Sequence, residues 1–167
     1  MSWKGKLLIG IAAAILLTAI FFMIYVVRAK YRSNEYILQL GAAFNAAILV
    51  NGDETLTDPE YAVISEYDGK KYLIVPENYK ALNTLLRKDA VMPIFGNSLK
   101  DAPLSIRICD TALVRIRPNK HSVDGASIYF DTGTQHFYMH VKGGNIWTQI
   151  LSWATKGSTH YDNIPLE

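Results

Sequence analysis

The stretch at residues 7–27, LLIGIAAAILLTAIFFMIYVV, contains no charged residue and only Thr18 and Tyr25 as polar side chains. At about 1.5 Å of rise per residue, a helix of this length matches the roughly 30 Å hydrocarbon core of a bilayer. Basic residues flank the stretch at both ends, where they oppose entry into hydrocarbon; they are Lys4, Lys6, Arg28, Lys30 and Arg32. The stretch therefore predicts a transmembrane helix.

A cleaved signal peptide is the alternative interpretation, because Val27-Arg28-Ala29 satisfies the small-residue rule for a cleavage site. The apolar run is longer than the roughly 7–15 residues usual for a signal peptide, which favours an uncleaved signal anchor. The positive-inside rule does not decide the orientation, since the basic groups on the two sides balance. The resemblance to an export signal predicts a single-pass protein of the cell membrane with its C-terminal domain outside the cytoplasm.

The chain length predicts one domain behind the anchor. We expect a basic tail at 1–6, the anchor at 7–27, a juxtamembrane helix or stalk at 28–52, an α+β domain at 53–157 and a C-terminal tail at 158–167. When the five basic residues that flank the apolar stretch are left out, the chain contains 12 Lys and Arg and 15 Asp and Glu. A slightly acidic domain argues against a nucleic-acid partner. The single cysteine, Cys109, lies between apolar stretches and is expected to be buried and inert.

Residues 28–52 carry apolar side chains at helical spacing, including Ile37, Leu40 and Phe44. Ser33 or Asn34 could cap a separate helix here, or the segment could continue the anchor as a rigid stalk. Within the anchor, Gly10, Ala14 and Thr18 recur every four residues, a spacing that suits the close approach of a second membrane helix but is also common in membrane spans.

Asp68-Gly69 separates the β-rich runs YAVISEY and KKYLIV, which predicts a two-residue type I′ hairpin. In that register Glu66 faces Lys71 and Val63 faces Ile74. A short helix is expected over residues 77–88 and another from about residue 146 to Lys156-Gly157. Hairpins joined by short turns indicate an antiparallel sheet with two or three helices packed on it, an α+β fold whose strand order is left open.

Apolar side chains alternate from Leu104 to Ile116 and predict one buried face. The other face carries Arg107, Arg115 and Arg117, which could form an anion or lipid-headgroup site or a solvated strand surface.

A second hairpin is expected around Thr132-Gly133, with Ile128 opposite Phe137 and Ala126 opposite Met139. Its polar side presents Tyr129, His136 and Tyr138, residue types that suit recognition of a partner. Trp147 and Trp153 follow closely, and in the alternative interpretation the C-terminal helix covers this face and makes its aromatic residues part of the core.

Asp131-Thr132-Gly133-Thr134, preceded by apolar Ile128, Tyr129 and Phe130, resembles the catalytic motif of aspartic proteases. The resemblance covers about eight residues, a length at which chance matches are common, and implies two chains whose Asp131 carboxyl groups share a proton and activate water. The chain after Gly133 is short for the flap and second apolar segment of the retroviral-type members, and Thr132-Gly133 also suits a turn.

His136 and His140 lie about 13 Å apart on one strand, too far to share a metal ion, and the sequence indicates no metal and no cofactor. The layout is similar to that of small single-pass membrane proteins of bacteria. We expect a non-catalytic binding or accessory domain at the membrane surface, whose partners are the lipid bilayer and a protein or a second copy of the chain. A subunit of a membrane complex is a further interpretation, and a membrane-tethered dimeric hydrolase using Asp131 is the alternative.

Overall fold

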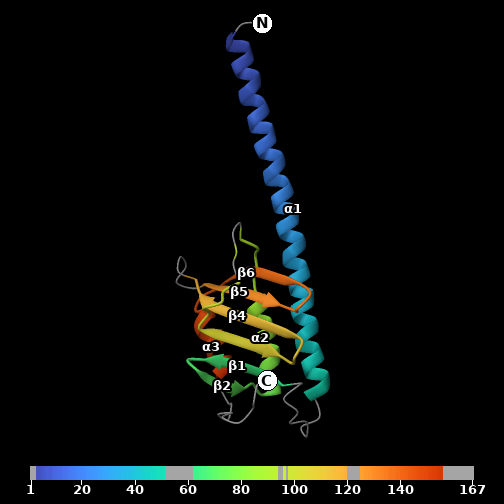
Figure 1. Ribbon diagram of the computed structural model, residues 1–167, viewed down its shortest axis with the longest axis vertical. Helices are drawn as coiled ribbons and strands as arrows, with labels where there is room; N and C mark the ends of the chain where they lie inside the picture. The colour runs from blue at the N-terminus through green and yellow to red at the C-terminus, as the bar shows by residue number, and fades with distance from the viewer. Residues whose placement is uncertain (1–2, 52–61, 94–95, 97, 120–124, 156–167) are drawn as a thin grey trace.

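The computed structural model describes residues 3–51, 62–93, 96, 98–119 and 125–155. It begins with helix α1 (Trp3–Asn51), which continues through Ser33 and Asn34 without a break, so the continuous-helix alternative holds and neither residue begins a new helix. The first half of α1 projects away from the domain and the second half lies along it (Figure 1). By length and composition, α1 is able to cross a membrane.

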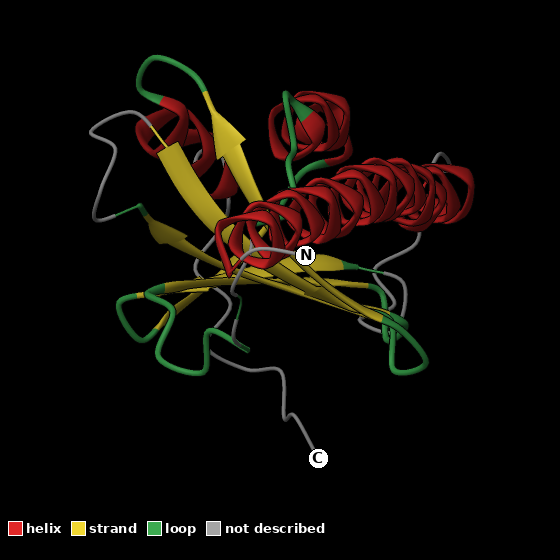
Figure 2. Ribbon diagram, turned by 90° about the horizontal axis from the view of Figure 1, so that it is seen from above, coloured by secondary structure: helices red, strands yellow, loops and turns green. Residues whose placement is uncertain are grey.

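The described residues form one antiparallel six-stranded sheet in the order β2-β1-β3-β4-β5-β6. The strands are β1 (Val63–Tyr67), β2 (Lys70–Leu73), β3 (Leu104–Ile108), β4 (Ala112–Pro118), β5 (Gly125–Asp131) and β6 (His136–Lys142). Helices α1, α2 (Pro76–Arg87) and α3 (Ile146–Thr155) all lie on one side of this sheet (Figure 2). The predicted α+β fold is therefore confirmed.

The hairpin between β1 and β2 has the predicted register. Glu66 is paired with Lys71, and the Ile74 N–H donates to the Val63 carbonyl oxygen at 2.9 Å. Asp68 and Gly69 have φ values of 52° and 69°. Because a type I′ turn requires positive φ at both central residues, the Asp-Gly pair accounts for the tight connection.

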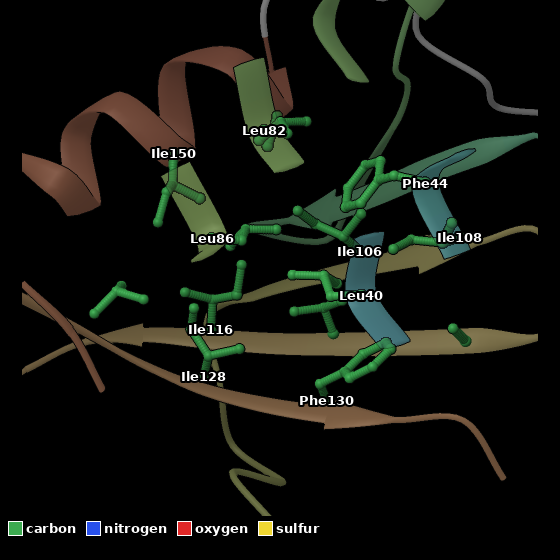
Figure 3. Packing of buried hydrophobic residues seen from close by; sticks show 14 of the residues in the cluster. Leu40, Phe44, Leu82, Leu86, Ile106, Ile108, Ile116, Ile128, Phe130 and Ile150 are labelled. Carbon is green, nitrogen blue, oxygen red and sulfur yellow. The ribbon is translucent and has the colours of Figure 1, made fainter. Parts of the chain in front are cut away.

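The core lies between the sheet and the three helices (Figure 3). The second half of α1 contributes Tyr36, Leu40 and Phe44, all of which are fully buried. The Tyr36 hydroxyl donates to the Leu86 carbonyl oxygen of α2 at 2.7 Å, which satisfies a polar group that burial removes from water. This half of the helix is therefore a structural layer of the domain as well as the continuation of the apolar stretch.

The hairpin between β5 and β6 differs from the predicted register by two residues. Ile128 is paired with Met139 and Phe130 with Phe137, so the prediction of Ile128 opposite Phe137 and Ala126 opposite Met139 is wrong. Residues 132–135 form the connection, in which the Thr132 N–H donates to the Gln135 carbonyl oxygen at 2.9 Å. Side-chain hydrogen bonds of Asp131 and Thr132 to this main chain favour the longer loop over a two-residue turn. A register shift of two residues leaves each side chain on the same face of the sheet, so the apolar side chains still face the core.

Candidate functional site: a cleft at the β6 edge

A cleft of about 380 Å³ lies at the β6 edge of the sheet. It is bounded by the exposed face of β5 and β6, by α1 and by the segment that follows α2. Its lining residues are Arg32, Met92, Pro93, Gly96, Ser98, Tyr129, His136, Phe137, Tyr138 and Met139. Tyr129, His136 and Tyr138, predicted from sequence as one surface, do line one cleft.

Three contacts hold Val91, Met92 and Gly96, which follow α2, in place. Val91 forms a β-bridge with His140, with N···O distances of 2.9 and 2.8 Å. The Tyr25 hydroxyl of α1 donates to the Met92 carbonyl oxygen at 3.1 Å. Gly96 lies against the Tyr138 ring so closely that any Cβ at this position would overlap it. Met92, Pro93 and Gly96 line the cleft, and the chain that follows α2 lies beside β6 (Figure 1).

Arg32 joins α1 to the β6 edge. Its Nη2 donates to the His136 carbonyl oxygen at 2.7 Å, and its Nη1 lies 3.1 Å from Glu35 Oε2. The guanidinium carbon is also 4.5 Å from the centre of the Phe137 ring, within the range of a cation–π contact. Sequence reasoning placed Arg32 only among the charges that flank the apolar stretch, because nothing local indicated its partner on β6.

The main-chain polar groups of Tyr138 lie at this edge of the sheet. His140 directs both its N–H and its C=O away from β5, toward Val91. In an antiparallel sheet every second residue of an edge strand has this orientation, so the N–H and C=O of Tyr138 also point away from β5. Neither group has a hydrogen-bond partner among the described residues. Tyr138 therefore lies on the strand edge between the Arg32 contact at His136 and the Val91 bridge at His140.

Aromatic and cationic groups line the exposed face beside this edge. The rings of Tyr129 and His136 stack with their centres 6.1 Å apart, and the Arg115 guanidinium lies 5.6 Å from the Tyr129 ring centre. Arg115 Nη1 donates to the Ser98 carbonyl oxygen at 3.3 Å. Burial, with a further contribution from the Asp131 carboxylate, raises the pKa of Tyr129, so its hydroxyl remains a neutral hydrogen-bond donor.

The three arginines predicted on this face differ in their contacts. Arg107 lies near the turn after β3, where Nη1 is 3.0 Å from Asp110 Oδ1. Arg115 contacts Tyr129 and Ser98, which line the cleft, and the charge of Arg117 acts on His140. Burial, together with the charges of Lys142 and Arg117, lowers the pKa of His140.

Trp147 and Trp153 lie on α3, away from the exposed face. Helix α3 packs its buried residues, Ile146, Ile150 and Ala154, into the core on the helical side of the sheet. The alternative in which the C-terminal helix covers Tyr129, His136 and Tyr138 is therefore wrong. The physical reason is that the apolar face of α3 already has its partners in the core.

Asp131 takes part in the turn after β5. Its Oδ1 accepts a hydrogen bond from the Gly133 N–H at 2.8 Å, the arrangement of an Asx turn. Among the described residues, no group of three or more His, Cys, Asp or Glu side chains could hold a metal ion. Cys109 is buried, and burial and Asp110 raise the pKa of its thiol.

The predicted helix-packing residues lie in the projecting half of α1. Gly10, Ala14 and Thr18 are all exposed, and the Thr18 hydroxyl donates to the Ala14 carbonyl oxygen at 2.9 Å. This local hydrogen bond satisfies the only polar group of the strip, which suits an apolar environment.

Comparison of the chain with models of protein families, with curated proteins and with solved structures finds no match. The structure itself defines the class: an α+β domain whose first helix is long and apolar enough to cross a membrane.

Proposed function

We propose that this chain is a single-pass membrane protein whose domain, outside the cytoplasm, binds an extended segment of a protein partner beside the bilayer. Binding takes place at the β6 edge and involves no catalysis. The single observation that carries the proposal is the outward-facing main chain of Tyr138, which has no hydrogen-bond partner among the described residues and belongs to a residue that lines the cleft.

Strand addition to an exposed sheet edge is a common mode of peptide recognition, in which the main chain supplies affinity and side-chain pockets supply specificity. Here the Tyr138 N–H and C=O would bond to the main chain of the partner. Tyr129 and His136 would contact alternate side chains of the bound segment. Arg32 and Arg115 bring positive charge to the rim, which favours a segment with acidic residues.

The position of the cleft favours a partner that is itself in the membrane. Residues 7–27 would span the hydrocarbon, and Arg32 follows Val27 by about 7.5 Å of helix rise. The cleft that Arg32 lines would therefore open close to the headgroups, where the first residues outside a partner's own membrane span would pass. A second copy of the chain is one such partner, and assembly of a membrane complex would use the same surface.

Site-specific photo-crosslinking in intact membranes tests this proposal. A benzoylphenylalanine replaces Tyr129 in the cleft or, as a control, Tyr72 on β2 at the opposite edge of the sheet. We expect an adduct of defined mass from position 129 and none of that mass from position 72. Equal adducts at both positions, or none at position 129, would overturn the proposal.

A matched pair of variants tests the role of the main chain. Tyr138→Ala and Tyr138→Pro both remove the side chain, but only proline also removes the outward N–H, and an edge strand tolerates proline. We expect the adduct at position 129 to persist in the alanine variant and to disappear in the proline variant. Thermal unfolding of both variants shows whether the fold is retained, and equal adducts from two folded variants would exclude strand addition.

The orientation is tested separately by labelling Lys70→Cys, at the exposed first residue of β2, with an impermeant thiol reagent. A Cys109→Ala background removes the natural thiol. Labelling of intact cells supports the domain lying outside. Labelling only after permeabilisation would show that the domain faces the cytoplasm.

The alternative function, a dimeric hydrolase using Asp131, is supported by the Asp-Thr-Gly-Thr motif alone. It would require Asp131 of a second chain to approach closely enough to share a proton. Asp131→Asn distinguishes the two proposals, because it would abolish hydrolysis and leave the crosslink from position 129 intact.

A further inference from the structure

We propose that the segment at residues 91–93 is a second membrane contact, docking on the lipid surface beside α1 and holding the β6 edge against the headgroups. This inference rests on the proposed membrane span of residues 7–27. It adds to the proposed function an interaction surface for lipid that is separate from the helix.

The depth of the segment follows from the hydrogen bond between Tyr25 and Met92. Tyr25 precedes Val27, the last residue of the apolar run, by about 3 Å of helix rise. If residues 7–27 fill the hydrocarbon, the Tyr25 hydroxyl lies at the boundary between acyl chains and headgroups, where tyrosine is enriched. Since the Met92 carbonyl oxygen is 3.1 Å from that hydroxyl, Met92 lies at the same boundary.

The segment has the chemistry of an interfacial contact. Residues 91–93 are Val, Met and Pro, and Val91 is 44% exposed although it is apolar. The sequence continues with Ile94 and Phe95, whose positions lie outside the described residues. The exposed apolar surface of Val91 loses unfavourable contact with water when it enters lipid.

Several main-chain polar groups of the segment have hydrogen-bond partners within the protein. The Val91 N–H and C=O are paired with His140, and the Met92 carbonyl oxygen accepts from Tyr25. Pro93 has no N–H to satisfy. Unsatisfied main-chain groups are costly near the hydrocarbon, so these pairings lower the cost of placing the segment at the lipid boundary.

Basic side chains lie around the same edge. Arg28 and Lys30 follow the apolar run on α1, Lys88 is the C-cap of α2, and Lys142 ends β6. Positive charge near a membrane surface attracts anionic headgroups. Lipid is thus the occupant that fits both the apolar segment and its basic surroundings.

Depth-dependent fluorescence quenching tests the inference in the full-length protein. An environment-sensitive NBD label is attached to Met92→Cys, in a Cys109→Ala background, in nanodiscs of three parts phosphatidylcholine to one part phosphatidylglycerol. Nitroxide lipids labelled near the headgroup serve as quenchers. We expect blue-shifted emission and loss of fluorescence at Met92, and neither at Lys70→Cys on the far edge of the sheet.

A probe at Leu17→Cys, in the middle of the apolar run, separates failure of this inference from failure of the anchor. Quenching of Leu17 by deep nitroxide lipids without quenching of Met92 would overturn the second contact and leave the anchor standing. An unquenched Leu17 would overturn the membrane span and this inference together. Blue-shifted emission at Met92 without lipid quenching would show that protein covers the segment, which also overturns the inference.

Tyr25→Phe provides a matched variant, because it removes only the hydroxyl. We expect weaker quenching at Met92 in this variant, since the segment loses its hydrogen bond to the helix, with unchanged quenching at Leu17. Unchanged quenching at Met92 would show that Tyr25 does not set the depth of the segment and would overturn that step of the inference.

Discussion

The hydroxyl of Tyr25 donates a hydrogen bond to the main-chain carbonyl oxygen of Met92, at 3.1 Å and 67 positions further along the chain. This contact joins the end of the apolar stretch to the segment that forms one wall of the cleft. Arg32 makes a second contact of α1 with this edge through its hydrogen bond to His136. The two hydrogen bonds hold α1 to the β6 edge at two points along the helix.

The first prediction concerns this hydrogen bond. Tyr25→Phe should weaken the attachment of residues 91–93 by about 1 kcal/mol, the net value of one hydrogen bond. Hydrogen exchange of the Val91 amide, which is bonded to His140, should then become about fivefold faster. Tyr31→Phe is the control, because Tyr31 is an exposed tyrosine of the same helix. Equal exchange of Val91 in the two variants would contradict the prediction.

The second prediction concerns the second half of α1 as a layer of the core. Leu40 is fully buried, so Leu40→Ala should lower the free energy of unfolding of the domain by about 2–5 kcal/mol through lost burial and the remaining cavity. Leu38 of the same helix is 71% exposed, so Leu38→Ala should change the free energy of unfolding by less than about 0.5 kcal/mol. Denaturant unfolding in detergent measures both. A small effect at Leu40 would mean that the domain folds without this half of α1.

The third prediction concerns pH. Burial, Lys142 and Arg117 lower the pKa of His140, so the folded protein binds a proton at this site less readily than the unfolded chain, whose histidine titrates near about 6.5. This difference in pKa stabilises the folded protein. The stabilisation is fully present at pH values above the pKa of the unfolded chain and is lost as the pH falls below that pKa. In the neutral form, Nδ1 can accept from Asn119 Nδ2, 3.3 Å away, leaving Nε2–H to face the Tyr138 hydroxyl at 3.4 Å.

We therefore expect the free energy of unfolding to fall between about pH 7 and pH 5 with a slope that His140→Gln reduces. Denaturant titrations across this range measure the slope. An identical slope in the variant would show that other groups carry the pH dependence.

The fourth prediction concerns Asp131. Its carboxylate accepts from the Gly133 N–H, so Asp131→Ala should destabilise the hairpin by about 1 kcal/mol. Asp131→Asn keeps an oxygen in the same place and should change stability by less than about 0.5 kcal/mol. Thermal unfolding of the two variants gives the comparison. Equal destabilisation by both would mean that the negative charge, rather than the acceptor, holds the turn.

Several features of the fold were predictable because their causes are local. The positive φ angles of Asp68 and Gly69 follow from the chemistry of a two-residue turn, and that turn determines the pairing of Glu66 with Lys71. The alternation from Leu104 to Ile116 predicted correctly which side chains are buried. The second hairpin shows how such reasoning fails, since Thr132-Gly133 suited a short turn but side-chain hydrogen bonds stabilise a longer loop.

The sequence by itself determined the apolar helix, the turn chemistry and the alternation of the strands, because each depends on residues a few positions apart. Only the tertiary structure decided the position of β1 beside β3, the burial of Tyr36 and Leu40, and the assembly of the cleft. These features depend on contacts such as Tyr25 with Met92 and Arg32 with His136, whose partners are far apart in the chain. Such contacts leave no periodic pattern in the sequence, because a single long-range hydrogen bond constrains one residue at each end and none between them.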